Sequence, residues 1–394
     1  MKKIGLLWRV IIGIAAGIGV GFIAPEWLAR TTATFNSVFS SFLGFIIPLL
    51  IVGFVAPAIA DIGRKAGAML GVTVLVAYAF TFGSGALAYF VADSVFPSLI
   101  ASETATALPS AEVADPVASA PYFTIALDPL MTVMTALVLA FVLGFGCAVI
   151  PGASAMRRGL ADFRDIIRLV IASVIIPLLP VYIFGIFLDM TISGVVGGIL
   201  ATFIKIIAVI FVLHVGVLVL QYCIASLFSR RNPFKALWTM MPAYFTALGT
   251  QSSAATIPVT LNRTVAMGVD RDIAGFTVPL CATIHMSGST LKIVACALAL
   301  MISGSMPYDW PMFAGFIAML GITIVAAPGV PGGAIMASLG LLSSMLGFSE
   351  SDNAMMIALY IAMDSFGTAC NITGDGAIAQ IIERIFRKRT FAAA

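Results

Sequence analysis

The stretch Asp364-Ser-Phe-Gly-Thr-Ala-Cys-Asn-Ile-Thr-Gly-Asp375 places two acids and two polar side chains inside a mostly apolar part of the chain. Asp364, Thr368, Asn371 and Asp375 follow at spacings of four, three and four residues, which puts them on one face of an α-helix. The segment 358–382 is apolar enough to lie in a membrane, where carboxylates are costly and usually face a cavity. This face therefore predicts a surface that binds a cation and a small substrate.

A structural explanation of the same residues is that each acid pairs with a basic side chain on a neighbouring helix. Nearly all lysines and arginines of the chain stand at the ends of apolar segments. This distribution favours the binding surface over pairing.

The composition indicates an integral membrane protein. The 394 residues are 61% hydrophobic and 10% charged, with a mean hydropathy of +1.10, whereas soluble domains carry about 25% charged residues. Apolar stretches of about 20 residues, the length that spans a bilayer, recur from end to end. This repetition excludes a soluble domain with a single anchor.

The apolar segments change character along the chain. Six spans are predicted at 5–25, 38–60, 67–95, 122–151, 166–188 and 196–227. From 234 to 382 the segments are instead interrupted by Ser, Thr, Gly and Pro clusters, at 249–258, 283–290, 327–333 and 367–376. Unwound backbone at membrane depth is tolerated where it is buried in protein or lines a cavity. The functional centre is therefore expected in the C-terminal part, as in transporters with broken helices.

The positions of lysine and arginine predict the orientation. Basic clusters recur at alternate segment ends, and by the positive-inside rule both termini are cytoplasmic. Arg231 and Arg263 flank the segment 234–262 on the same side, so it must turn back as a hairpin. Asp309 and Glu350 require the same of 312–347 from the opposite side. Two oppositely directed re-entrant hairpins imply an inverted repeat with a site between the tips.

The hairpin tips are rich in residues that free backbone groups. The first tip, Gly249-Thr-Gln-Ser-Ser-Ala-Ala-Thr-Ile-Pro258, places serines at a helix start, where N–H groups can meet a substrate carboxylate. The second, Ala326-Ala-Pro-Gly-Val-Pro-Gly-Gly333, frees carbonyls that can coordinate a cation. Contacts of small residues between helices, and simple Gly/Pro kinks, are the structural alternatives.

Between the hairpins, Cys281-Ala-Thr-Ile-His-Met-Ser-Gly-Ser289 interrupts a span at 274–306. Exposed carbonyls of such a stretch suit Na⁺. His285 is a candidate proton carrier, because imidazole titrates near neutral pH; the alternative is a neutral histidine bonded to the backbone. Lys292 either pairs with a carboxylate of the last helix, which we favour, or snorkels from a partly wet site.

Together these motifs resemble the dicarboxylate/amino acid:cation symporter family, which includes glutamate and neutral amino acid transporters. The resemblance covers essentially the whole chain and rests on Gln251 to Pro258, Phe276 to Ser289, Gly329-Val-Pro-Gly332 and Asp364 to Asp375. It implies an all-α integral membrane fold with eight transmembrane helices and two oppositely directed re-entrant hairpins. Inverted repeats and an elevator-type transport mechanism belong to the same expectation.

The resemblance also implies a division of the chain. Residues 1–65 would form scaffold helices 1 and 2, 66–98 transport-domain helix 3, 99–121 an external loop, and 122–190 scaffold helices 4 and 5. Residues 194–387 would complete the transport domain with helix 6, hairpin 1 at 234–262, broken helix 7 at 274–306, hairpin 2 at 312–347 and helix 8 at 353–387. The expected assembly is a homotrimer in a bacterial inner membrane, in contact with lipid and with no nucleic-acid partner.

By matching position, the resemblance assigns the site. Asp364 would bind the substrate amino group, while Asn371 and the Ser252–Ser253 tip would hold the α-carboxylate. The full substrate set would be Gln251, Ser252, Ser253, Ser289, Gly329, Val330, Gly333, Asp364, Gly367, Thr368 and Asn371. Na⁺ would be held, in part by backbone carbonyls, by Cys281, Thr283, His285, Met286, Asn371 and Asp375. His285 and Lys292 are candidates for ion coupling, which leaves a proton as a second candidate ion.

Two departures from the family pattern bear on specificity. Acidic amino acid members carry an arginine three residues after the amine-binding aspartate, where this chain has Gly367. A guanidinium is the natural receptor for a side-chain carboxylate, so its absence argues for a neutral substrate. The usual Asn-Met-Asp-Gly-Thr reads His285-Met-Ser-Gly-Ser289, and a Thr-Ser pair reads Thr81-Phe82. One or two Na⁺ sites are therefore expected, with a third lost or replaced by a protonatable group.

The sequence thus predicts a Na⁺-driven symporter of a small amino acid, neutral and similar to serine, threonine or alanine, and not an enzyme. Na⁺- or H⁺-coupled uptake of dicarboxylates or acidic amino acids is the alternative, with Lys292 acting in place of arginine. An intramembrane aspartyl protease is disfavoured because Asp364 and Asp375 stand eleven residues apart on one helix, about 16 Å by helical rise. A passive channel would differ in lacking accumulation against a gradient.

Overall fold

The computed structural model describes residues 6–64, 68–107, 120–150, 152–194, 196–325 and 332–390. All regular structure within these residues is helical. The helices are α1 (Leu6–Gly21), α2 (Glu26–Arg64), α3 (Ala68–Ala107), α4 (Val133–Val149), α5 (Ser154–Val170), α6 (Ile176–Ile192), α7 (Val196–Ser229), α8 (Pro233–Thr250), α9 (Ser253–Ala266), α10 (Arg271–Ile284), α11 (Ser287–Ser303), α12 (Trp310–Val325), α13 (Gly333–Leu346), α14 (Glu350–Ala362) and α15 (Asp364–Thr390). A π-helical turn, Ile171–Ile175, joins α5 to α6.

Several of these helices match the dimensions of a bilayer. Among the described residues, five helical stretches are long and apolar enough to cross a membrane, and the bent pair α14–α15 makes a sixth. The expected first and fourth spans, α1 and α4, are apolar but contain only 16 and 17 residues. A multi-pass membrane protein therefore agrees with the helix lengths, while the full number of eight spans stays a prediction.

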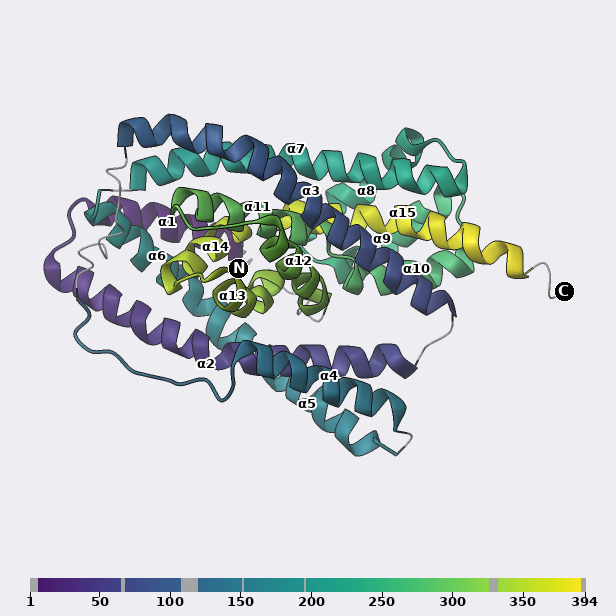
Figure 1. Ribbon diagram of the computed structural model, residues 1–394, viewed down its shortest axis with the longest axis horizontal. Helices are drawn as coiled ribbons and strands as arrows, with labels where there is room; N and C mark the ends of the chain where they lie inside the picture. The colour runs from purple at the N-terminus through teal and green to yellow at the C-terminus, as the bar shows by residue number, and fades with distance from the viewer. Residues whose placement is uncertain are drawn as a thin grey trace, which may run out of the picture.

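Two groups of helices lie on either side of a third, central group. In Figure 1, α2, α4 and α5 lie along the lower edge and α7 lies along the upper edge, while α3 crosses the view from the upper left to the lower right. The C-terminal helices lie between the two edges. Helix α1 packs on α6 and α2 packs on α4, α5 and α6. Helix α15 is enclosed by α3, α7, α8, α9, α10 and α11. The polar face of α15 is thus surrounded by protein.

Helices α8 and α9 form a hairpin whose two ends meet on Glu383 of α15. Arg231, just before α8, pairs with Glu383 at 2.7 Å and donates to the carbonyl of Gly268, just after α9. The backbone N–H of Asp270 donates to the same carboxylate at 2.9 Å. Because both ends of the segment reach one residue, the chain turns back between α8 and α9, as predicted for 234–262.

Helices α12 and α13 pair in the same manner. They contact each other, and a Cβ placed on Gly347, just after α13, would lie 3.9 Å from the side chain of Met306, just before α12. The two helices contain 16 and 14 residues, or about 24 and 21 Å of rise. Each is shorter than the hydrocarbon core of about 30 Å, which is consistent with a segment that enters and returns.

The predicted single helix 8 at 353–387 is two helices. Helix α14 ends at Ala362, α15 begins at Asp364, and the pair is bent by 63°. The predicted interruption at 367–376 was wrong, because α15 is continuous there. Its glycines serve neighbouring helices instead: a Cβ on Gly374 would collide with Gln221 and His285.

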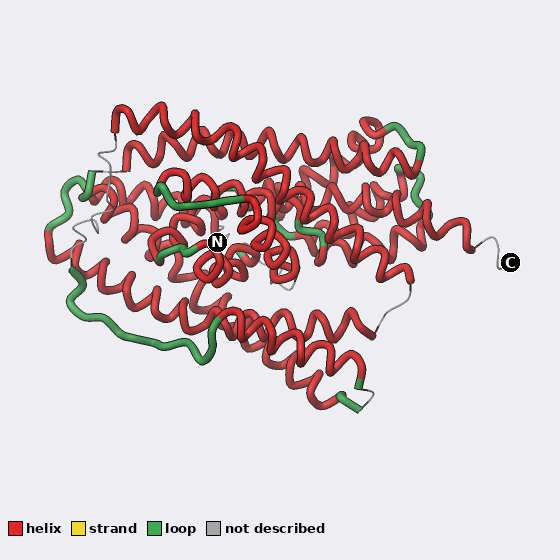
Figure 2. The backbone as a smooth tube through the Cα atoms, viewed as in Figure 1, coloured by secondary structure: helices red, strands yellow, loops and turns green. Residues whose placement is uncertain are grey.

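Two boundaries near the predicted external loop also differ. Residues 99–107 belong to α3, because Leu, Ala and Glu favour a helix; residues 108–119 of that loop lie outside the described part. The expected span 122–151 begins as a loop, drawn in green in Figure 2, and becomes helical only at Val133. This loop is held against α2, where Thr34 accepts from the backbone of Tyr122 and Arg30 lies over its ring at 4.4 Å.

Candidate functional site

Helix α15 presents the predicted polar face to the interior. Asp364 is its first residue, and Thr368, Asn371 and Asp375 follow on successive turns. Asp364 is 6% exposed, Asn371 4% and Asp375 0%. The break at Met363 leaves the N-terminus of α15 free of a preceding turn, and an acid in the first turn is stabilised there by the helix dipole.

Asp364 is paired with a lysine from α11. Lys292 Nζ lies 3.0 Å from Asp364 Oδ1, and the side chain of Lys292 is fully buried. The other oxygen, Oδ2, accepts a hydrogen bond of 2.8 Å from the backbone N–H of Gly332, which precedes α13. The expected pairing of Lys292 with a carboxylate of the last helix is confirmed.

The ammonium of Lys292 also fills the space beside Gly367. A Cβ on Gly367 would lie 2.7 Å from Nζ and 2.9 Å from Cε. The same Nζ stands 3.4 Å from the ring centroid of Tyr360 on α14, a cation–π geometry. Acidic amino acid members of the family that the chain resembles carry arginine at the position of Gly367. Here the glycine has no side chain, and the ammonium of Lys292 occupies the space beside it.

Asn371 and Ser289 bond to each other and to the break in the α10–α11 span. Asn371 Oδ1 accepts from the backbone N–H of Gly288 at 2.8 Å, and its Nδ2 donates to Ser289 Oγ at 3.1 Å. Ser289 Oγ also receives the Tyr360 hydroxyl at 3.2 Å. The structure thus brings together Asp364, Asn371 and Ser289 of the predicted substrate set.

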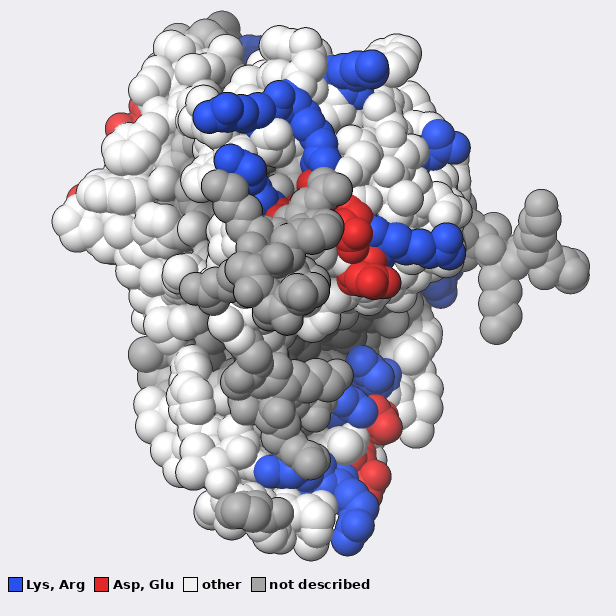
Figure 3. Space-filling view, turned by 90° about the vertical axis from the view of Figure 1, so that its right-hand side faces the viewer, with Lys and Arg blue, Asp and Glu red and all other residues white. Residues whose placement is uncertain are grey.

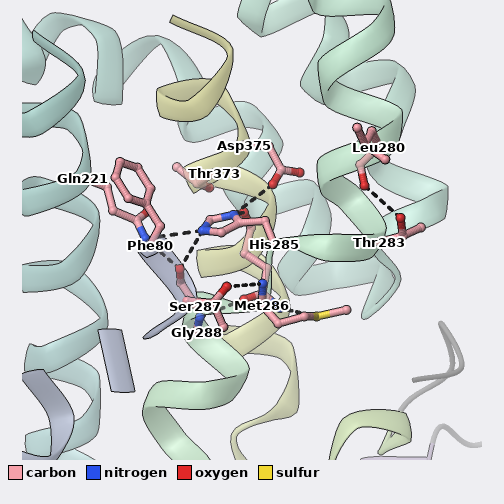
Figure 4. A network of polar contacts seen from close by, with 12 residues as sticks. Phe80, Gln221, Leu280, Thr283, His285, Met286, Ser287, Gly288, Thr373 and Asp375 are labelled. Atoms are coloured by element: carbon pink, nitrogen blue, oxygen red, sulfur yellow. Dashed lines mark hydrogen bonds and ion pairs between the residues drawn. The ribbon is translucent and has the colours of Figure 1, made fainter. Parts of the chain in front are cut away.

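His285 occupies the centre of a second buried network (Figure 4). Its Nδ1 lies 3.0 Å from Asp375 Oδ1 and 3.1 Å from the carbonyl oxygen of Asn371. Gln221 Nε2 donates to Ser287 Oγ at 2.8 Å, and Ser287 Oγ lies 2.6 Å from His285 Nε2. Since both partners of Nδ1 are acceptors and Ser287 has its hydroxyl hydrogen left to give to Nε2, these contacts fit a neutral imidazole protonated on Nδ1.

The imidazole N–H points at two of the oxygens expected to bind Na⁺. The carbonyl of Asn371 and Asp375 Oδ1 both accept from His285. Asp375 Oδ2, in contrast, is buried and has no hydrogen-bond partner among the described residues. A buried carboxylate oxygen without a donor is what a cation would satisfy. A cation on Asp375 would therefore find Oδ2 without a donor, whereas Oδ1 and the Asn371 carbonyl already accept from His285.

The first hairpin tip has the expected helix start. Gln251 adopts a left-handed conformation with φ of 52°, which reverses the chain after α8. Ser252 then caps α9, where its side chain accepts from the N–H of Ala255 at 3.3 Å, and Ser253 is the first residue of α9. Both arms of the hairpin contact α15, and the described contacts of these three tip residues lie within the tip itself.

The remaining predicted residues divide into three groups. Gly329 and Val330 lie outside the described residues, whereas Gly333 opens α13. Met286 Sδ accepts from Asn371 Nδ2 at 3.5 Å, and Cys281 is buried, its carbonyl accepting from the N–H of His285. Thr283 and Thr368 bond to carbonyls of their own helices, Leu280 and Asp364 respectively.

Three polar residues in contact with this site escaped the sequence interpretation. Gln221 and Tyr222 of α7 reach Ser287 and the carbonyl of Thr373, and Tyr360 of α14 reaches Ser289. The sequence does contain a signal for Gln221 and Tyr222, because these adjacent polar residues interrupt an otherwise apolar span. Tyr360 gave no such signal, since a lone tyrosine in a span is usually packing.

Pairing of the acids with basic side chains is realised in part. Asp364 has Lys292, and Asp375 has the neutral N–H of His285. Lys292 is an exception to the placement of nearly all basic residues at segment ends, because it lies within α11. Asp375 Oδ2 nevertheless has no hydrogen-bond donor among the described residues.

A comparison with known families agrees with this geometry. A sequence model of the sodium:dicarboxylate symporter family matches residues 6–385, which is nearly the whole chain. The matched range includes both hairpins, the broken α10–α11 span and the polar face of α15. The chain therefore belongs to the sodium:dicarboxylate symporter family, which is made up of sodium-coupled transporters of dicarboxylates and amino acids and not of enzymes.

Proposed function

We propose that this protein couples Na⁺ movement to the uptake of a small neutral amino acid similar to serine, threonine or alanine. Asp364 would receive the α-ammonium group, while Asn371, Ser289 and the Ser252–Ser253 tip would receive the α-carboxylate. Gly367 leaves little room for a long side chain, because the Lys292 ammonium fills the space in front of it.

The observation that carries this proposal is the charge balance of the buried site. Asp364 and Lys292 cancel each other at 3.0 Å, so the substrate site is neutral before any ligand arrives. A zwitterion adds no net charge, whereas aspartate adds one negative charge and succinate adds two. Uncompensated charge in a membrane interior is costly, which favours the zwitterion.

The same balance favours one sodium ion at Asp375. Asp375 is fully buried, and the contacts of His285 fit a neutral ring. One Na⁺ beside Asp375 Oδ2 would therefore leave the loaded site without net charge. A second ion site at Thr283, Met286 and the second hairpin tip stays a proposal by resemblance. The third site of the family is proposed to be lost, since Phe82 stands where the family has a serine and Ser287 stands where it has an aspartate.

The architecture is proposed to follow the family as well. The group α1, α2, α4, α5 and α6 would be the scaffold of a homotrimer, and the helices around α15 would move as the transport domain of an elevator. Lys and Arg gather on the end of the molecule shown in Figure 3. This gathering supports a cytoplasmic placement of that end, where α15 ends, in a bacterial inner membrane. The cytoplasmic placement of the N-terminus is proposed from the positive-inside rule alone.

A second candidate is the uptake of acidic amino acids or dicarboxylates. The specific observation in its favour is that Lys292 Nζ stands where an arginine side chain at position 367 would begin. A lysine can act as a point charge toward a substrate carboxylate. The added negative charge would then require at least one more cation, which would be a second Na⁺ or a proton.

Uptake into proteoliposomes distinguishes the two candidates. The purified protein is tested with radiolabelled L-serine, L-threonine, L-alanine, L-aspartate, L-glutamate and succinate, with Na⁺ and proton gradients set independently. We expect uphill accumulation of a neutral amino acid that collapses without the Na⁺ gradient. Accumulation of L-aspartate or succinate alone would assign the second candidate, and flux that only equilibrates the substrate would reject symport. A Hill slope for Na⁺ near three would contradict the loss of the third site.

A further inference from the structure

We propose that Lys292 is a tethered counter-cation of the transport cycle. Its ammonium occupies on Asp364 the place that the substrate ammonium takes in the loaded carrier, so the empty site can close and cross the membrane without a ligand. This inference rests on the proposed role of Asp364 as the amine receptor. It adds a step that the family assignment does not contain, namely the return of the empty carrier with an internal ion pair.

The position of Lys292 resembles that of a bound ligand more than that of a surface ion pair. Its side chain is fully buried, and its Nζ contacts Asp364 Oδ1 at 3.0 Å and the carbonyl of Met363 at 3.5 Å. The ring of Tyr360 covers it at 3.4 Å. A carboxylate, a carbonyl and an aromatic face together form a receptor for an ammonium group.

The second hairpin is closed on the same carboxylate. Gly332, with φ of +78°, precedes α13 and donates its N–H to Asp364 Oδ2 at 2.8 Å. The positive φ is accessible to glycine without strain. One oxygen of Asp364 therefore receives the ammonium of Lys292 and the other receives the hairpin. The closure of this hairpin and the neutralisation of Asp364 are coupled through one side chain.

The other substrate-binding groups are satisfied internally in this closed arrangement. Asn371 bonds to Gly288 and Ser289, and Ser289 also accepts from Tyr360. The described groups of the site thus satisfy one another's hydrogen bonds. Without Lys292, this closure would bury the charge of Asp364 unpaired, which is strongly unfavourable in a membrane interior.

Net uptake and exchange separate this role from a merely structural one. Exchange of external for internal substrate uses only the loaded carrier, whereas net uptake requires the empty carrier to return. In proteoliposomes with Na⁺ on both sides, exchange of L-[³H]serine by Lys292→Met measures what the variant loses in the loaded carrier. The variant should lose at least tenfold more of its net Na⁺-driven uptake than of this exchange. L-[³H]aspartate is run in parallel, so a different substrate class does not obscure the comparison.

Chemical rescue tests the charge itself. Ethylammonium is small enough to enter the space that Lys292→Ala vacates, and it should restore net uptake in that variant and leave the wild type unchanged. Lys235→Met, which removes an exposed lysine of α8, is the matched control and should retain both modes. Equal loss of exchange and net uptake in Lys292→Met, or unchanged net uptake, would overturn the proposal.

A measurement on the wild-type side chain at position 292 covers the case in which the variant does not fold. Nitroxides on Val325, the last residue of α12, and on Ala254 of α9 report the distance between the hairpins by pulsed electron resonance. The proposal requires one closed distance without Na⁺ or substrate, unchanged when L-serine is added. A broad or longer distance in the empty carrier would reject it. If the wild type transports L-serine in either case, the proposed function stands independently of this result.

Discussion

Lys292 and Gly367 occupy complementary volumes, since a Cβ at position 367 would lie 2.7 Å from the lysine Nζ. The glycine lacks the side chain that would exclude the lysine, and the lysine supplies the cation that the glycine cannot. Lys292 belongs to α11 and Gly367 to α15. Neither segment by itself therefore predicts that the positive charge beside position 367 comes from the other helix.

The first prediction concerns placing a positively charged side chain at position 367 of α15. Gly367→Arg alone should abolish uptake, because the new side chain meets Lys292 and overpacking of a tight site costs about 1–3 kcal/mol. The double variant Gly367→Arg with Lys292→Ala should recover transport and prefer L-aspartate over L-serine. Competition of each amino acid against labelled uptake measures the preference. An acid-preferring Gly367→Arg with Lys292 intact would show that the two side chains do not share this space.

The second prediction concerns Asp364. Asp364→Asn should abolish binding of L-serine and lower stability by about 3–5 kcal/mol, because it leaves the buried ammonium of Lys292 unpaired. Thermal unfolding with and without L-serine measures both effects. Asp272→Asn, which changes an exposed acid in the first turn of α10, is the matched control. A ligand-induced shift of the melting temperature that survives in Asp364→Asn would contradict the role of Asp364.

The third prediction concerns His285. His285→Asn should raise the apparent Na⁺ affinity, since it frees the Asn371 carbonyl and Asp375 Oδ1 from the imidazole N–H. A hydrogen bond to a charged group is worth about 1.5–3 kcal/mol, so the half-saturating Na⁺ concentration should fall by about tenfold or more. Na⁺ titration of L-serine uptake gives this value. His214→Asn, at the other buried histidine, should leave it unchanged, and an unchanged value in His285→Asn would place the cation elsewhere.

The fourth prediction concerns Asp375. Na⁺ should raise the melting temperature of the wild type by the linkage relation for a ligand that binds the folded state. Asp375→Asn should remove this shift, because the buried oxygen without a donor is lost. The comparison uses NaCl against choline chloride at equal ionic strength. A Na⁺-specific shift that persists in Asp375→Asn would reject Asp375 as a ligand.

The fifth prediction concerns the base of the first hairpin. Arg231→Ala should destabilise the protein by about 1.5–3 kcal/mol, the range for a hydrogen bond to a charged group. The loss arises because Glu383 is 4% exposed and loses its 2.7 Å partner, while Gly268 loses a donor. Arg263→Ala, at an exposed position of α9, is the control. Equal melting temperatures for the two variants would show that this pair does not anchor the hairpin.

Much of the fold was readable along the chain because its signals are local. Runs of apolar residues gave the helices, and the charges flanking 234–262 gave the first hairpin, whose ends do meet on Glu383. The spacing of Asp364, Thr368, Asn371 and Asp375 placed them on one helix, as α15 confirms. The bend at Met363 was missed because glycine-rich 367–376 looked like the weaker segment, although its glycines accommodate neighbouring helices.

The sequence by itself determined the membrane helices, the first hairpin and the polar face of α15, because apolar runs, helical period and flanking charge are properties of neighbouring residues. Only the tertiary structure decided which basic side chain faces each acid. Lys292 meets Asp364 across 72 positions of the chain and His285 meets Asp375 across 90. Contacts at such separations depend on how whole helices pack, and the electrostatic balance of a buried site is set by those contacts.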